Sequence, residues 1–161
     1  MSADPKSSVF LYIAAVPRVQ DKVSCSYLLR WDPKKKFSLA KSTGTVDEIS
    51  SIGISDDATF LAIGTKSGVV EIYTTYNLAR IYRKVHAHGI FVTSLVFLPT
   101  MWPETANLLN GAEVGLVSVS VDKQIVLHTV TPRKSFSILW ILSGAICLIY
   151  LFFWSLIHFR L

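Results

Sequence analysis

The chain has 161 residues and a formal net charge of +5, and 51% of its residues are hydrophobic. Its mean hydropathy of +0.44 is too high for an ordinary soluble domain, while its length excludes a transporter with many membrane spans. The basic residues are scattered rather than gathered on one element, which argues against a nucleic-acid-binding protein, and the two cysteines lie in different environments, which excludes a disulfide framework.

In chain order, the sequence divides into a leader, a body and a tail. Residues 1–8 are expected to form a disordered leader. Residues 9–132 have the composition of an ordinary globular body, whereas 20 of the 26 residues in 136–161 are hydrophobic. We therefore expect a soluble body, located in the reducing cytosol, followed by a membrane element.

The body consists of short β-rich runs separated by turn residues. They recur with a period of about 42 residues, and the last copy carries an insertion at 100–112. Four short strands in a unit of this length are the pattern of a WD-type β-propeller blade. The predicted runs are 9–16, 26–32, 48–55, 61–68, 70–73, 92–98, 116–123 and 125–128.

The repeat phase assigns to the body strands two to four of one blade, one full blade, and strands one to three of another. This predicts an all-β fold with about two and a half WD-type β-propeller blades, and hence an incomplete propeller. Closed propellers have roughly four to eight blades. We therefore expect a C-terminal portion of a longer propeller, a short isoform or an incomplete gene model, and the residues do not choose among the three.

One set of polar residues in the third unit is expected to tie its strands together. His88 opens the first strand, Ser120 lies in the second, and Asp122 lies in the tight turn that follows. At this spacing the three side chains can share buried hydrogen bonds, which offset the cost of burying polar groups. His128 occupies the place where WD blades usually hold Trp.

Other polar motifs are better explained by structure than by chemistry. The pair His86 and His88 lacks the further ligands that a metal site needs. Asp56 and Asp57 fall in a predicted turn, where Asp bonds the local backbone. The sequence contains no phosphate loop and no nucleophile elbow, so we expect no catalytic, cofactor or metal site in this chain. The run Lys34-Lys35-Lys36 is expected to be a solvated turn, with contact to acidic lipid headgroups as the alternative.

The tail is predicted to be one C-terminal transmembrane α-helix. Residues 136–157 contain no charge, and 22 residues of helix span roughly the 30 Å of a bilayer core. Arg133 and Lys134 precede the span, which favours a cytosolic body and leaves 158–161 as a short lumenal tail. A buried core helix is the less favoured alternative, because such helices seldom lack a polar face over this length. The residues expected to mark the anchor are Phe136, Trp140, Gly144, Tyr150, Trp154 and Ile157.

Several runs of the body are similar to one protein family. The runs 25–32, 60–68, 86–93 and 96–99, together with the apolar tail, resemble the C-terminal portion of the prolactin regulatory element-binding protein family. Its members are membrane-anchored WD-repeat guanine-nucleotide exchange factors for the Sar-type GTPase of the COPII coat. The resemblance implies a seven-bladed cytosolic propeller at the endoplasmic reticulum membrane, serving transport towards the Golgi.

The resemblance also implies a partner, the Sar-type small GTPase, and a regulatory rather than an enzymatic role. In that family a potassium-binding loop of an N-terminal blade carries the exchange, and no part of this sequence matches that blade, so no catalytic residue is transferred. One alternative is a tail-anchored WD-repeat scaffold without exchange activity. The least favoured is a DNA-binding regulator, since no nucleic acid partner is expected.

Overall fold

The computed structural model of this chain describes residues 9–18, 26–99 and 103–131, together with Ile146, Leu148, Ile149 and Trp154. The chain divides into two units, Met1–Thr131 and Pro132–Leu161. The first unit is built from antiparallel β-sheets, so the predicted all-β class is confirmed for the body. Its strands are β1 (Leu11–Ala15), β2 (Ser26–Asp32), β3 (Ser38–Thr45), β4 (Ile49–Ile54), β5 (Phe60–Thr65), β6 (Val70–Thr74), β7 (Arg80–Lys84), β8 (Val92–Phe97), β9 (Val114–Ser120) and β10 (Ile125–Val130).

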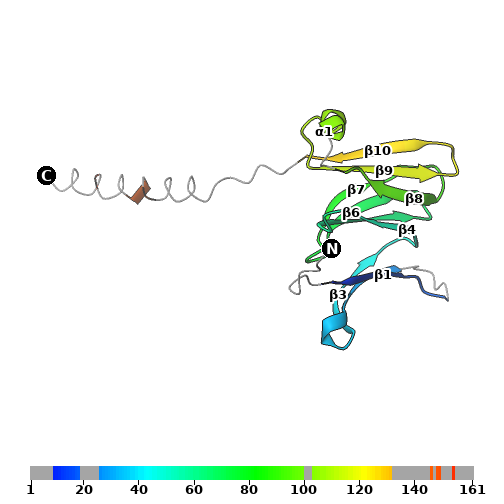
Figure 1. Cartoon of the computed structure of the whole chain (residues 1–161), viewed down its shortest axis with the longest axis horizontal. Coiled ribbons are helices and arrows are strands. Elements are labelled where there is room, and N and C mark those ends of the chain that lie inside the picture. Colours follow the sequence, from blue (N-terminus) through cyan, green and yellow to red (C-terminus); the bar gives the residue numbers. More distant parts are fainter. Residues whose placement is uncertain are drawn as a thin grey trace, which may run out of the picture. The chain divides into compact units, whose positions relative to one another are not determined.

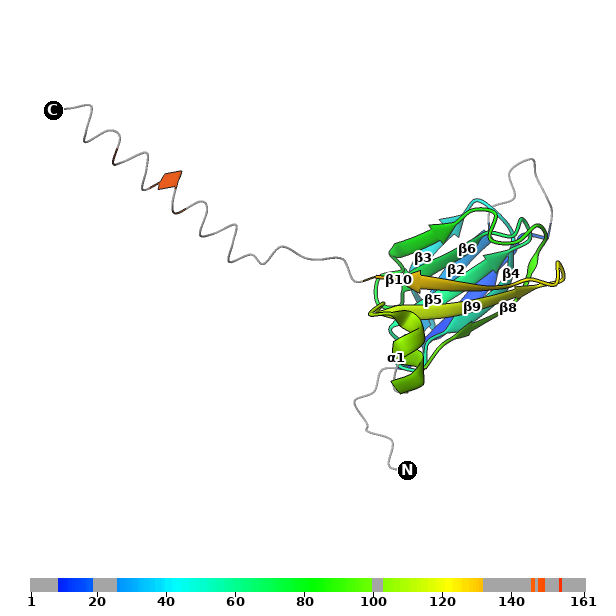
Figure 2. The ribbon, with the colours of Figure 1, turned by 90° about the horizontal axis from the view of Figure 1, so that it is seen from above.

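The strands form three sheets in chain order. The first contains β1-β2-β3, the second β4-β5-β6-β7 and the third β8-β9-β10, with each strand hydrogen-bonded to its neighbour in sequence. Figures 1 and 2 show the sheets stacked face to face, with the four-stranded sheet between the other two. In the part of the chain that the structure describes, the three sheets do not close into a ring.

The two inner strands of the middle sheet, β5 and β6, are buried on both faces, which explains the nearly continuous apolar sequence of β5. On β5, Leu61 and Ile63 pack towards the first sheet, with Leu28, whereas Ala62 packs towards the third sheet, with Leu116. All four of the large side chains in this set are fully buried. A strand with two buried faces needs apolar residues at successive positions instead of at alternate ones.

Close approach of the second and third sheets depends on Gly64. A Cβ atom added there would lie 2.5 Å from the Cβ of Val92 on β8, closer than two carbon atoms can approach. The absence of a side chain at Gly64 therefore lets β5 and β8 meet.

The insertion at 100–112 contains a short helix, α1 (Pro103–Leu109). Leu109 is buried, and a Cβ atom on Gly115 would lie 2.3 Å from its Cδ2. The last turn of α1 is thus seated on the beginning of β9.

The predicted anchor at 136–157 lies outside the described residues, except for Ile146, Leu148, Ile149 and Trp154, whose backbone is helical. The residues Phe136, Trp140, Gly144, Tyr150 and Ile157 and the flanking Arg133 and Lys134 are not among those described. Within the described part of the chain, no helix has both the length and the apolar character needed to cross a membrane.

Candidate functional site

The polar residues expected to tie the third unit together form a chain of hydrogen bonds around His88. Nδ1 of His88 lies 3.1 Å from a carboxylate oxygen of Asp122, and its Nε2 lies 2.7 Å from Oγ of Ser118. The backbone N–H of Gly89 also donates to Asp122, at 3.1 Å. His88 is buried, so these contacts replace the water that its ring loses on folding.

The hydroxyl in this series of hydrogen bonds belongs to Ser118, whereas the sequence spacing predicted Ser120. Ser118 and Ser120 lie on the same face of β9, because alternate residues of a strand point the same way. Ser120 donates instead to the Phe91 carbonyl, at 2.7 Å, and accepts from the backbone N–H of Asp122 at 3.5 Å. Sequence spacing alone cannot distinguish the two serines, since the register of β8 against β9 shifts between Val92 and Ser94.

From Ser118 the series of hydrogen bonds extends through His128 to Tyr82 in the neighbouring sheet. Its Oγ lies 2.8 Å from Nε2 of His128, and Nδ1 of His128 lies 3.2 Å from the hydroxyl of Tyr82 on β7. The rings of Tyr82 and His128 also meet edge to face, with centroids 5.7 Å apart. No motif in the sequence marks Tyr82, because only the folding of the chain brings it beside His128.

One arrangement of protons satisfies every member of the chain. The hydroxyl of Tyr82 donates to His128, Nε2–H of His128 donates to Ser118, Ser118 donates to His88, and Nδ1–H of His88 donates to Asp122. The chain of bonds joins the second and third sheets, and its role is structural.

The pKa values of His128 and Asp122 are consistent with this arrangement. Burial, with smaller contributions from the nearby His88 and Lys84, lowers the pKa of His128 to about 4. Partial burial acts to raise the pKa of Asp122, but hydrogen bonds from the backbone N–H groups of Gln124 and Gly89 and from His88 outweigh it, so this pKa is lowered. His128 is therefore neutral and Asp122 ionised at neutral pH.

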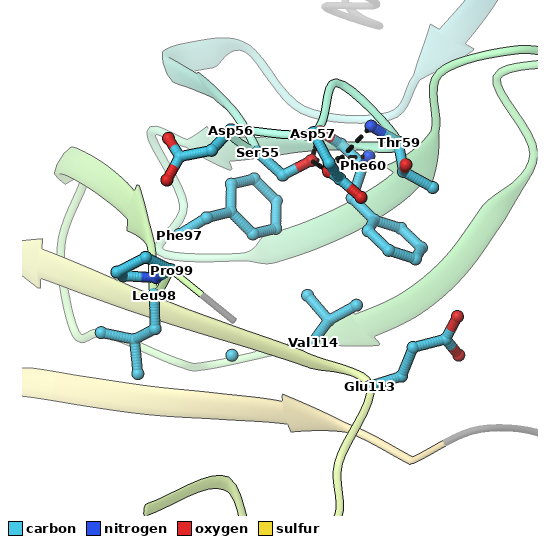
Figure 3. Close-up of a pocket in the computed structure, with 11 residues that line it drawn as sticks. Ser55, Asp56, Asp57, Thr59, Phe60, Phe97, Leu98, Pro99, Glu113 and Val114 are labelled. Carbon is cyan, nitrogen blue, oxygen red and sulfur yellow. Dashed lines mark hydrogen bonds between the residues drawn. The ribbon is translucent and has the colours of Figure 1, made fainter. Parts of the chain in front are cut away.

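A cavity of about 330 Å³ opens between the β4–β5 turn and the adjoining ends of β8 and β9. Figure 3 shows the Phe60 and Val114 side chains facing each other across it, with the Glu113 carboxylate nearby. Phe97 and Pro99 contribute further apolar surface. Asp56, Asp57 and Glu113 bring carboxylates to the rim, so the cavity suits an apolar side chain that ends in a positive charge.

Asp57 also organises the turn beside the cavity, as its position in the sequence predicted. Its Oδ1 accepts from the hydroxyl of Ser55 at 2.6 Å and from the N–H of Thr59 at 3.0 Å. Burial opposes ionisation, but these hydrogen bonds prevail and lower the pKa of Asp57. Among the residues that the structure describes, no group of His, Cys, Asp and Glu could hold a metal ion.

Comparison with known proteins identifies two similar curated proteins. The chain is 35% identical over 141 residues to the guanine nucleotide-exchange factor SEC12 of Mus musculus, covering 86% of this chain and 33% of that protein. It is 34% identical to the same factor of Rattus norvegicus, with the same coverage. The chain thus spans about a third of the length of these relatives.

No family model matches the chain. Among solved structures, the crystal structure of the computationally designed Ika4 protein superposes with a TM-score of 0.47 and 15% sequence identity. That superposition covers 72% of this chain and 64% of the designed protein.

Proposed function

We propose that this chain is part of a guanine-nucleotide exchange factor of the SEC12 type. The observation that carries the proposal is the 35% identity to the mouse exchange factor, which extends over 86% of the chain. The runs that resemble the prolactin regulatory element-binding protein family include strands β2 and β5 and part of β8, one strand from each sheet, so the similarity includes the folded body.

The three sheets are, in this proposal, adjacent blades of a WD-type β-propeller. Their antiparallel strands follow one another in chain order, and the sheets stack face to face. The bonds from His88 to Asp122 and Ser118 join the entry of β8 to the β9–β10 turn, as the WD pattern requires. The first and third sheets have three strands and the second has four.

The proposed activity is exchange on a Sar-type small GTPase, which starts COPII coat assembly and transport from the endoplasmic reticulum to the Golgi. An exchange factor acts by binding the nucleotide-free GTPase more tightly than the loaded form. Such discrimination requires a shaped contact surface, and this chain supplies part of the propeller on which that surface is carried.

We place the protein at the endoplasmic reticulum membrane, with 136–157 as a single-pass anchor and the sheets in the cytosol. The uncharged apolar sequence of this segment and the preceding Arg133 and Lys134 support that topology. Protease protection of residues 158–161 in sealed microsomes, with digestion of the body, is the expected result.

A segment exchange in the mouse relative tests the activity. The part of mouse SEC12 that aligns with this chain is replaced by this chain, and release of fluorescent GDP from a Sar-type GTPase is followed on vesicles. We expect the chimera to accelerate release as the unmodified mouse protein does. A chimera that is folded and membrane-bound but inactive contradicts the proposal.

The cavity beside Asp57 supports a second candidate, a scaffold that binds a protein segment without nucleotide exchange. Its apolar walls and carboxylate rim fit a Lys or Arg side chain from a partner. A scaffold captures the GTPase or another coat component equally well in the GDP-bound, GTP-bound and nucleotide-free states. An exchange factor instead prefers the nucleotide-free state, so the two candidates differ in one binding measurement.

A further inference from the structure

The β2–β3 hairpin ends in a strongly basic tip. The short helix η1 (Pro33–Lys35) follows Asp32, and Lys36 and Phe37 complete the turn before β3. The carboxylate of Asp32 accepts from the backbone N–H of Lys34 at 3.0 Å, so the acid nearest the tip serves as a helix cap. The four lysines of the hairpin, all exposed, are Lys34, Lys35, Lys36 and Lys41.

The same tip exposes apolar side chains. Phe37 is 61% exposed and Leu39 is 49% exposed. Lys36 and Phe37 both have a φ of 52°, in the left-handed region that bulky residues rarely adopt. This left-handed backbone forms the turn at the tip of the hairpin. Here it displays an aromatic ring beside a cluster of positive charges.

We infer that this tip, defined by residues 33–41, binds an anionic lipid surface. Lysine ammonium groups attract acidic headgroups, and an aromatic ring enters the boundary between headgroups and acyl chains. The exposed Leu39 continues the apolar surface. Its side chain can contact the acyl chains at that boundary, whereas the charged phosphates of a nucleic acid backbone offer it no apolar contact. Arg30 is the arginine closest in sequence to the tip. Its guanidinium donates to the Thr75 carbonyl at 3.0 Å and lies over the Phe10 ring, so it is already engaged by these two residues.

This contact is independent of nucleotide exchange and of the apolar tail. It gives the body its own affinity for membranes that carry negative charge. Because exposed charges are screened by salt, the contact weakens as ionic strength rises.

The experiment uses the full chain inserted in nanodiscs of phosphatidylcholine, so that the apolar tail is already embedded in lipid and does not insert into the test vesicles. These nanodiscs are floated with vesicles of phosphatidylcholine alone or of phosphatidylcholine with phosphatidylserine. We expect binding only to the phosphatidylserine vesicles, with loss of that binding at high salt.

Charge variants locate the contact. The double variant Lys35→Glu/Lys36→Glu is expected to bind phosphatidylserine vesicles at least roughly 30-fold more weakly, from the loss of two lysines at an anionic surface. The matched control Lys84→Glu/Lys123→Glu changes the net charge equally at exposed sites on β7 and in the β9–β10 turn, and it should change binding less than about threefold.

Phe37 variants test insertion of the ring. Phe37→Asn keeps a residue that tolerates the left-handed region and should weaken binding about tenfold. Phe37→Trp should retain binding and shift its fluorescence emission to the blue with phosphatidylserine vesicles. An unchanged far-UV circular dichroism spectrum shows that each variant is folded.

Three results would overturn the inference. The first is equal binding to the two kinds of vesicle, and the second is equal loss in the control variant. The third is a tip-dependent affinity for a single-stranded RNA oligonucleotide that exceeds the affinity for phosphatidylserine vesicles, which would assign the tip to nucleic acid instead.

Discussion

At the scale of single residues, Ser118 is the centre of the hydrogen bonds that join the second and third sheets. Ser118→Ala leaves the Nε2 atoms of His88 and His128 without their partner, and both rings are buried. We expect a loss of about 2 kcal/mol in unfolding free energy. Ser120→Ala removes the bond to the Phe91 carbonyl and a long bond from the Asp122 N–H, and it should cost about 1 kcal/mol.

Urea unfolding of the full chain in detergent, followed by far-UV circular dichroism, measures both values. The sequence pattern alone assigns the larger effect to Ser120. A greater loss for Ser120→Ala than for Ser118→Ala would therefore favour that assignment over the one in the structure.

His128 makes the stability of the body depend on pH. The folded state holds the pKa of His128 at about 4, because the ring is buried, whereas the unfolded chain has its ordinary value of 6.5. Between these values the unfolded state binds more protons, so the unfolding free energy decreases as the pH falls from 6.5 towards 4. The contribution of His128 to this decrease is about 2 kcal/mol.

Urea titrations between neutral and mildly acidic pH measure this dependence. His128→Phe keeps an aromatic ring beside Tyr82 but cannot be protonated, so the decrease should be smaller by the contribution of His128. As a control, His86→Asn removes an exposed histidine and should leave the slope unchanged. An identical slope in the native chain and in His128→Phe contradicts the prediction.

At the scale of strands and sheets, Gly64 sets the distance between the second and third sheets. Gly64→Ala places a methyl group against the Cβ of Val92, and β5 or β8 must move. We expect a loss of about 2 kcal/mol. Gly89→Ala meets no atom within 4 Å and should be neutral. Hydrogen exchange of the peptides that contain β5 and β8 should increase in the first variant only.

The strands predicted from apolar runs match the structure because burial dictates both. The run at 92–98 is β8 (Val92–Phe97), and the run at 26–32 is β2 (Ser26–Asp32). β3 (Ser38–Thr45) lacks such a run, since most of its side chains are exposed, and only the strand count implied it. The seven-residue α1 depends on the contact of Leu109 with β9, which no local pattern reveals.

The candidate site was only partly predictable for a similar reason. A turn Asp and a His before a strand can be placed together from their spacing, as His88 and Asp122 are. The choice between Ser118 and Ser120 depends on strand register. The contact of Tyr82 with His128 depends on the packing of two sheets, which the spacing of residues in the chain does not encode.

At the scale of the whole first unit, the two outermost sheets each turn an apolar face to solvent. The third sheet exposes Val96, Val119, Ile125 and Leu127, and the first exposes Leu11, Ile13, Tyr27 and Leu39. Exposed apolar faces of this kind promote association. The chain also spans about a third of the length of the exchange factors that it resembles.

Substitutions on the two faces of the third sheet should have opposite consequences. Ile125 is 74% exposed and Leu116 is fully buried against the second sheet. Ile125→Lys should change the unfolding free energy by less than about 0.5 kcal/mol and reduce association, because it adds charge to an exposed apolar face. Leu116→Ala should cost about 3 kcal/mol, because it leaves a cavity between packed sheets.

Light scattering of the full chain in detergent, over a range of concentrations, measures association, and urea unfolding measures stability. The two variants should differ in which measurement they change. Ile125→Lys should change association, and Leu116→Ala should change the unfolding free energy. If Ile125→Lys destabilises the fold as much as Leu116→Ala does, the outer face of β10 is covered within the chain. The stacking of sheets described for the first unit would then be wrong at its third sheet.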